Sequence, residues 1–147
     1  MARAGWLAKT EPSTYSWDDL VREGGTRWDG VRNPLARNHL AAMKLRDLVL
    51  IYHSGDEKAV VGIAKVTRAA YPDPTADDER WVAVDLAPVK PLTSRVPLAA
   101  VKKDAKLGAI ALVRQGRLSV MPLDDAAFAR ILEHGKTKPP ARKQGAT

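Results

Sequence analysis

Two nearly continuous apolar runs, residues 47–53 and 59–67, place the strongest constraint on the fold of this chain. Both are rich in valine, isoleucine and leucine, and β-branched residues favour strands. A short strand with apolar side chains on both faces is typically central in its sheet, because both faces must be covered. The two runs are separated only by residues 54–58, which is short enough for a hairpin loop. The sequence therefore predicts an antiparallel pair of strands in the middle of a sheet.

Further strands and helices are predicted on either side of this pair. Ser16 and Asp19 form a capping-box pattern that starts a helix, which Gly24 would end after about two turns. Asn33 before Pro34 is typical of the first residues of a second helix. The further elements expected from such signals are strands near residues 6–9, 81–87 and 118–121 and helices near residues 16–23, 34–43, 97–101 and 124–132.

Strands with helices spread among them, and no repeating strand–helix–strand unit, indicate an α+β fold. The sheet is expected to be a half-open β-barrel or a mixed, mainly antiparallel sheet flanked by short helices. A length of 147 residues, 45% of them hydrophobic, fits one domain with a core of ordinary size. We place this domain at residues 1–134 and a basic tail at residues 135–147.

The charge of the chain is unevenly distributed. The formal net charge is +7, and the tail holds +4 of it through Lys136, Lys138, Arg142 and Lys143, with no acidic residue. The tail has no apolar periodicity, which predicts a flexible segment. It could hold phosphates loosely or only raise solubility, and both interpretations stay open. The remaining +3 predicts a domain with modest, salt-sensitive affinity for nucleic acid in general.

Several classes of site lack the residues they need. The chain has no cysteine, which excludes disulfides, thiolate nucleophiles and cysteine-based zinc or iron–sulfur sites. His39, His53 and His134 are scattered without metal-ligand spacing, and no glycine-rich nucleotide loop is present. No apolar run approaches the ~20 residues of a membrane helix. We therefore expect a cytoplasmic monomer without a metal, a cofactor or a membrane partner.

Aromatic residues gather near the beginning of the chain. Four of the eight lie within the first 28 residues, namely Trp6, Tyr15, Trp17 and Trp28. Residues 28–33, Trp-Asp-Gly-Val-Arg-Asn, combine a flat ring, a carboxylate and an amide just before a helix N-terminus, which attracts phosphate. The ring can stack on a base, and the carboxylate and amide can recognise a base edge. The ring could also fill the core, so both interpretations stay open on the residues alone.

A longer set of motifs resembles a known family. The motifs are Lys9-Thr10-Glu11-Pro12, residues 15–20, residues 28–33, Ala36-Arg37-Asn38, Tyr52-His53-Ser54, Val61-Gly62-Ile63-Ala64, residues 70–75, residues 81–85 and residues 112–122. In this order they resemble the EVE domain family of the PUA-like superfamily, which includes the thymocyte nuclear protein 1 family, over roughly residues 4–134. The resemblance implies a β-barrel-like sheet flanked by helices, similar to YTH and ASCH domains, with a pocket for a single nucleobase.

The same resemblance implies a nucleic-acid-binding reader that holds one modified base, such as a modified cytosine or methylated adenine, of DNA or RNA without catalysis. Trp28 corresponds to an aromatic wall of the pocket. The other base-pocket candidates are Asp29, Asn33, Lys9, Ser54, Tyr52 and Trp81, and the phosphate-binding candidates are Arg32, Arg37 and Arg114. Pro34 stands where relatives often carry an aromatic residue, so one pocket wall is expected to differ.

Two other functions stay open. Lys9, Thr10 and Glu11 are the residue types that resemble the site with which ASCH relatives hydrolyse acylated cytidine. Consecutive residues on a strand point to opposite faces, however, so these three side chains need a turn in order to converge. The other function is a protein-interaction domain without a small ligand, which would be favoured if its own side chains fill the pocket.

Overall fold

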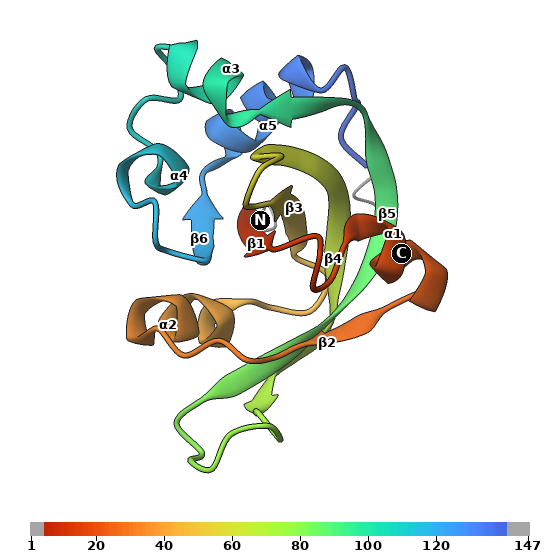
Figure 1. The fold of residues 1–147 in the computed structure, drawn as a ribbon, viewed down its shortest axis with the longest axis vertical. Helices are drawn as coiled ribbons and strands as arrows, with labels where there is room; N and C mark the ends of the chain where they lie inside the picture. Colours follow the sequence, from red (N-terminus) through yellow and green to blue (C-terminus); the bar gives the residue numbers. More distant parts are fainter. Residues whose placement is uncertain (1–4, 141–147) are drawn as a thin grey trace.

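The computed structural model describes residues 5–140 (Figure 1). Its strands are β1 (Gly5–Thr10), β2 (Thr26–Trp28), β3 (Leu48–His53), β4 (Ala59–Pro72), β5 (Val82–Pro97) and β6 (Val120–Leu123). Its helices are α1 (Trp17–Glu23), α2 (Pro34–Ala42), α3 (Leu98–Lys103), α4 (Ala111–Arg114) and α5 (Asp125–His134). Within the described residues, each helix is too short or too polar to cross a membrane.

The strands form one curved sheet in the order β2-β5-β4-β3-β1-β6. β1 and β3 pair in parallel, whereas the other neighbouring pairs are antiparallel. The sheet does not close, because β2 and β6 are its two edges, and short helices flank it (Figure 1). The structure therefore confirms the predicted α+β fold. It also confirms β3 and β4 as central, antiparallel neighbours joined by residues 54–58.

The first two helices begin at the predicted capping residues. Ser16 Oγ accepts the backbone N–H of Asp19, and the Asp19 carboxylate accepts the backbone N–H of Ser16. α1 ends at Gly24, whose φ of 75° is a left-handed conformation that glycine adopts without strain. Asn33 caps α2 by accepting a first-turn N–H at 2.9 Å, and Pro34 is the first helical residue. These caps fix the two loops on either side of β2.

Two strands are longer than their sequence patterns predict. The pattern of β5 predicts an end at Ala87, because Pro88 and Pro91 cannot donate ladder hydrogen bonds. β5 nevertheless continues to Pro97, since its register against β4 shifts next to both prolines. Such irregularities bend a strand and raise its twist, which suits the curvature of the sheet. β4 likewise continues to Pro72. No periodic pattern indicates β2 or α4, which have three and four residues.

The core contains three of the four aromatic residues near the beginning of the chain. Trp6, Trp17 and Trp28 are all buried. Nε1 of Trp6 donates a hydrogen bond of 2.9 Å to the buried carboxylate of Asp47. The ring of Trp17 lies against Gly62 so closely that a Cβ at residue 62 would be 2.6 Å from ring carbons. Packing in the core thus explains part of the aromatic cluster, whereas Trp28 also borders a pocket.

The chain stays attached to the sheet beyond the predicted start of the tail. The carbonyl of Gly135 accepts the N–H of Ser94 at 3.0 Å, and Oγ1 of Thr137 accepts the N–H of Thr93 at 2.8 Å. Both contacts join the chain after α5 to β5. The rest of the predicted tail, residues 141–147, lies outside the described residues. The division into a domain and a flexible tail therefore stays a prediction.

Candidate functional site

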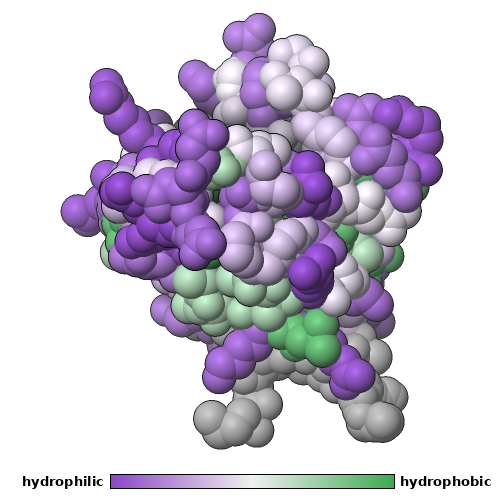
Figure 2. Space-filling view, turned by 90° about the horizontal axis from the view of Figure 1, so that it is seen from below, coloured by the Kyte–Doolittle hydropathy of each residue, from purple (hydrophilic) through white to green (hydrophobic). Residues whose placement is uncertain are grey.

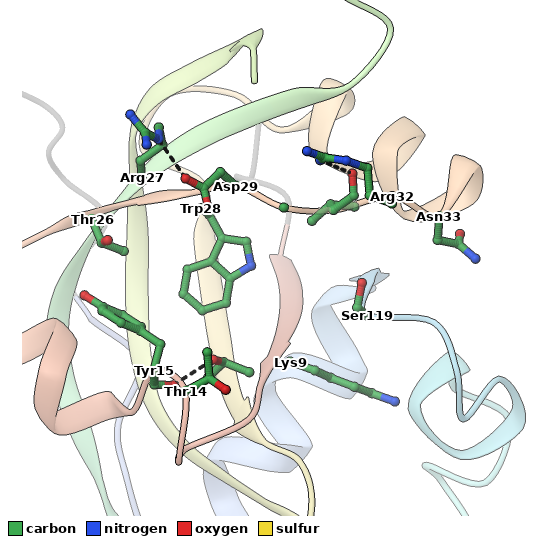
Figure 3. A pocket seen from close by; sticks show the side chains of 13 residues that line it. Lys9, Thr14, Tyr15, Thr26, Arg27, Trp28, Asp29, Arg32, Asn33 and Ser119 are labelled. Carbon is green, nitrogen blue, oxygen red and sulfur yellow. Dashed lines mark hydrogen bonds and ion pairs between the residues drawn. The ribbon is translucent and has the colours of Figure 1, made fainter. Parts of the chain in front are cut away.

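A pocket with a volume of about 640 Å³ opens between the end of β1, the loop from β2 to α2 and the residue before β6 (Figure 3). It is lined by Lys9, Thr10, Thr14, Tyr15, Thr26, Arg27, Trp28, Asp29, Gly30, Val31, Arg32, Asn33 and Ser119. The structure thus brings five of the predicted site residues to one cavity: Trp28, Asp29, Asn33, Lys9 and Arg32.

Trp28 is the last residue of β2 and forms an aromatic wall of the pocket. It is 8% exposed and packs edge-on against Tyr15, with 6.4 Å between ring centroids and 85° between ring planes. In Figure 3 the indole lies in the middle of the lining residues. In contrast to the indole N–H of Trp6, that of Trp28 meets no acceptor within residues 5–140. Trp28 therefore offers aromatic surface and a hydrogen-bond donor.

Asp29 and Asn33 each have one group engaged by the protein. Oδ2 of Asp29 accepts from Nε of Arg27 at 2.8 Å, which leaves Oδ1 of this half-buried carboxylate for a ligand. Oδ1 of Asn33 accepts the N–H of Ala36 at 2.9 Å in the cap of α2. The amide NH₂ of Asn33 is therefore its remaining donor. Figure 3 shows this side chain at the outer end of the loop, farther from Trp28 than Asp29 is.

The loop from β2 to α2 is held by the buried carboxylate of Asp73. Its Oδ2 accepts the N–H of Gly30 at 2.8 Å and Nη1 of Arg32 at 2.9 Å, and its Oδ1 accepts the hydroxyl of Thr75 at 2.6 Å. Burial alone would favour the neutral acid, but these hydrogen bonds outweigh it and hold the pKa of Asp73 well below its usual range. Asp73 therefore positions the loop as a fixed negative charge.

Lys9 joins the pocket to the loop before β6. Its Nζ donates to the carbonyl of Gly116 at 2.8 Å and lies 5.7 Å from the ring centroid of Tyr52. Partial burial lowers the pKa of the Lys9 ammonium from its ordinary value. The backbone N–H of Lys9 also donates to the carbonyl of Ser119 at 2.9 Å. Lys9 thus sets the distance between β1 and the start of β6 at the pocket.

The other predicted site residues lie outside the pocket lining. Tyr52 is buried on β3 beneath Lys9, and Ser54 follows it, with its N–H donating to the carbonyl of Thr10 at 2.9 Å. Trp81 lies before β5, with the guanidinium carbons of Arg32 and Arg37 each 5.9 Å from its ring centroid. Arg114 ends α4, where its Nε donates to the carbonyl of Gly108 at 3.0 Å. The roles assigned to these residues stay predictions.

Eight lining residues were not among the predicted candidates, namely Thr10, Thr14, Tyr15, Thr26, Arg27, Gly30, Val31 and Ser119. Tyr15 belongs to the N-terminal aromatic cluster, and its contact with Trp28 is the signal that could have indicated it. Ser119 has no local signal, because it reaches the pocket only through the antiparallel pairing of β6 with β1. Pairing between strands 110 residues apart is not visible in local patterns.

The lining suits a flat polar ring better than an ion. Aromatic surface comes from Trp28, donors from the Trp28 indole, Lys9 and Ser119, and an acceptor from Asp29. A heterocyclic base presents donors and acceptors at its edge and two faces that stack on aromatic rings. Within the described part of the chain, no group of three or more histidine, aspartate and glutamate side chains could hold a metal ion.

The open, mixed sheet with its flanking helices is the PUA-like α+β fold. An ASCH protein from Zymomonas mobilis superposes with a TM-score of 0.57 at 10% identity, covering 90% of this chain and 96% of that chain, which is a likeness of fold alone. The model of the EVE domain family matches residues 4–134. This chain therefore belongs to the EVE domain family.

Relatives with and without solved structures agree with this assignment. Mouse thymocyte nuclear protein 1 is 33% identical over an alignment of 168 positions, which covers 91% of this chain and 74% of the relative. A solved protein from Rhodopseudomonas palustris is 44% identical, with a TM-score of 0.86 and coverage of 90% of this chain and 93% of that chain. The crystal structure of human THYN1 with DNA containing 5-methylcytosine is 31% identical, with a TM-score of 0.85 and coverage of 92% and 99%.

Proposed function

We propose that this chain is a nucleic-acid-binding reader that accommodates a single modified nucleobase in the pocket beside Trp28. The observation that carries the proposal is that an aromatic wall, a carboxylate and several donors, from three separate segments, line one cavity. A nucleobase is a flat ring with polar groups at its edge, so it complements this lining. The human relative was crystallised with DNA containing 5-methylcytosine, which supports a modified base as the ligand.

The free groups of Trp28, Asp29 and Lys9 suit different parts of a nucleobase. Trp28 contacts the ring of the base, and a stacked base contributes about 1–3 kcal/mol in single-stranded complexes. The free oxygen of Asp29 accepts a hydrogen bond from an exocyclic amine, and Lys9 donates to a carbonyl oxygen or ring nitrogen. A base within a duplex must flip out at a cost of a few kcal/mol. Single strands should therefore bind more tightly than duplexes.

Discrimination of the modification must come from the shape of the pocket. Burial of one extra methyl group contributes only about 0.8 kcal/mol, which is less than a tenfold difference in affinity. A larger preference for the modified base needs a pocket wall that fits the methyl group closely or that disfavours binding of the unmodified base. Pro34 starts α2 next to the pocket residue Asn33, and the family resemblance implies an aromatic residue at this position in many relatives. The preference of this chain is expected to differ from that of relatives with an aromatic residue there.

The arrangement of Lys9, Thr10 and Glu11 favours binding over turnover. The hydroxyl of Thr10 donates to the carbonyl of Tyr15 at 2.7 Å, and the Glu11 carboxylate accepts from the Ser13 hydroxyl at 3.2 Å. Neither group is bonded to Lys9, whereas an activated nucleophile needs its base within hydrogen-bond reach. We propose that this chain acts without catalysis. The cytoplasmic location and the monomeric state stay predictions.

The experiment is a titration of fluorescent single-stranded oligonucleotides of one sequence. They carry cytosine, 5-methylcytosine, adenine or N6-methyladenine at one position, in DNA and in RNA. We expect one modified oligonucleotide to bind more tightly than its unmodified partner, and Trp28→Phe and Asp29→Asn to reduce this ratio. Asp56→Asn in the exposed hairpin loop is the control with the same change of charge. Equal affinity for every oligonucleotide, unaffected by the pocket variants, would contradict the proposal.

A further inference from the structure

The pocket is bordered on one side by an unusually basic stretch of surface. The basic segment, residues 98–119, includes α3, α4 and the loop before β6. Its exposed cations are Lys102, Lys103, Lys106, Arg114 and Arg117. Its one acidic residue, Asp104, is buried, and Oδ2 of Asp104 is 2.6 Å from Nε of Arg130 and 2.7 Å from Nε2 of His134. The exposed charges of the basic segment are therefore all positive.

The basic segment reaches the pocket directly. Lys9 donates through its backbone N–H to Ser119 and through its ammonium to Gly116, and both Lys9 and Ser119 line the pocket. Arg114 and Arg117 lie on either side of Gly116 in the chain, and both are exposed. Figure 1 shows α4 beside the loop that leads into β6. A chain leaving the pocket past Lys9 would therefore reach the loop that carries these two arginines.

A different loop, with the opposite charge, borders the pocket at the other side. The acidic loop, residues 73–81, holds four carboxylates and a single arginine, Arg80. It is tied to the pocket by the bonds of Asp73 to Gly30 and Arg32. Figure 2 views the molecule from below, the direction in which this loop projects in Figure 1, and shows hydrophilic residues over much of that face together with a smaller hydrophobic area. A phosphate backbone over the acidic loop would meet repulsion.

Three of the four arginines near the acidic loop have carboxylate partners, whereas the fourth, Arg37, donates to Asn38 and to the carbonyl of Arg80. Arg27, Arg32 and Arg80 each pair with a carboxylate at 2.8–2.9 Å, those of Asp29, Asp73 and Asp78. Within residues 5–140, Arg114 and Arg117 have no carboxylate within 4.0 Å. Arg114 donates through Nε to Gly108, which leaves its two terminal nitrogens for a ligand. A guanidinium without a carboxylate partner binds phosphate without first breaking an ion pair.

We propose that the basic segment binds the phosphates of the strand whose base occupies the pocket, on one side of that base only. The proposal rests on the proposed function, because the pocket fixes where the strand begins. Arg114 and Arg117 hold the first flanking phosphates, and the lysines of α3 extend the contact along the strand. Arg32 and Arg37, also predicted as phosphate contacts from the sequence, lie against Asp73 and the face of Trp81, and their phosphate role stays a prediction.

The test measures the salt dependence of binding for the double variant R114Q/R117Q. Each phosphate contact of a single strand contributes about 0.7 to the slope of log affinity against log salt, so loss of both lowers the slope by roughly 1.4. The ratio of affinities for modified and unmodified oligonucleotides should not change. The control is K44Q/K65Q, which removes the same charge from two exposed residues outside both surfaces and should lower the slope much less.

A second measurement tests the one-sided path. Oligonucleotides are shortened in steps from the 5′ or the 3′ end toward the modified base. We expect the slope of log affinity against log salt to fall when the oligonucleotide is shortened from one end only. In R114Q/R117Q, shortening from either end should have the same effect on this slope. Equal decreases of the slope for shortening from both ends, or equal slopes for R114Q/R117Q and K44Q/K65Q, overturn the proposal. In either case, an unchanged ratio of affinities for modified and unmodified oligonucleotides leaves the proposed function standing. A ratio of one with a lowered slope overturns the preference for a modified base alone, and absence of binding overturns both proposals.

Discussion

The backbone N–H of Trp17 donates a hydrogen bond of 3.0 Å to Nε2 of His53, which ties the first residue of α1 to the end of β3. Because Nε2 accepts, the ring proton is on Nδ1, which lies 2.7 Å from Oε1 of Glu57. Both Trp17 and His53 are buried. The sequence indicates no metal or catalytic partner for His53. In the structure this histidine joins α1 to β3.

We expect His53→Ala to lower the free energy of unfolding by about 1–3 kcal/mol, since a buried N–H loses its acceptor. His53→Gln, whose side-chain oxygen can replace Nε2 as the acceptor, should recover part of this loss. Urea denaturation followed by tryptophan fluorescence measures both variants. Equal stability of His53→Ala and the unchanged protein would show that the bond contributes nothing.

Asp73 should make the protein sensitive to acid. Its pKa in the folded protein lies below the unfolded value of about 3.9, so its charged form stabilises the fold above that pH. This stability is lost as the pH falls below about 4, toward the folded pKa. Asp73→Asn should cost about 1–3 kcal/mol at pH 7, because Arg32 and the N–H of Gly30 lose a charged acceptor.

The measurement for Asp73 is urea denaturation at pH 7 and at pH 3. The difference in stability between Asp73→Asn and the unchanged protein should be smaller at pH 3. Asp77→Asn, an exposed residue of the same loop, is the control. A constant difference at both values of pH would show that the Asp73 charge does not hold the loop.

Much of the fold is visible in local sequence signals. The capping residues Ser16 and Asn33 mark the beginnings of two helices, and the structure confirms both of them. The two apolar runs identify the central strands because burial on both faces demands apolar residues throughout. The length of β5 cannot be predicted from local signals, because Pro88 would normally end a strand. In the structure, register shifts against the long strand β4 accommodate this proline.

The candidate site is less predictable than the fold. Residues 28–33 lie together in sequence, and five predicted residues meet at one pocket because local caps fix that loop. The facing direction of Tyr52 depends on strand register, and the structure buries it beneath Lys9. Trp81 packs beside arginines that an acidic loop holds in place. The positions of these two side chains depend on contacts between segments that are distant in the sequence. The periodicity of apolar residues does not reveal such contacts.

Gly62 should tolerate no side chain. A Cβ at this position would lie 2.6 Å from the ring of Trp17, which is itself buried between α1 and the sheet. Gly62→Ala should therefore lower the free energy of unfolding by about 1–3 kcal/mol through overpacking. Gly108→Ala is the matched control, because the nearest atom to its Cβ would be 3.9 Å away. Comparable thermal stability of the two variants would contradict the close contact.

The chain after α5 should contribute to stability through Thr137 and to affinity through its charges. A chain ending at His134 loses the acceptors for the N–H groups of Thr93 and Ser94, which a chain ending at Pro140 retains. At about 1 kcal/mol for each hydrogen bond, we expect the shorter chain to be less stable by about 1–3 kcal/mol in urea.

Both truncated chains should bind nucleic acid with a weaker salt dependence, because each lacks Arg142 and Lys143. Their preference for a modified base should equal that of the full chain, since none of the removed residues lines the pocket within the described residues. Loss of that preference in the chain ending at Pro140 would show that the basic tail contributes to selection of the base.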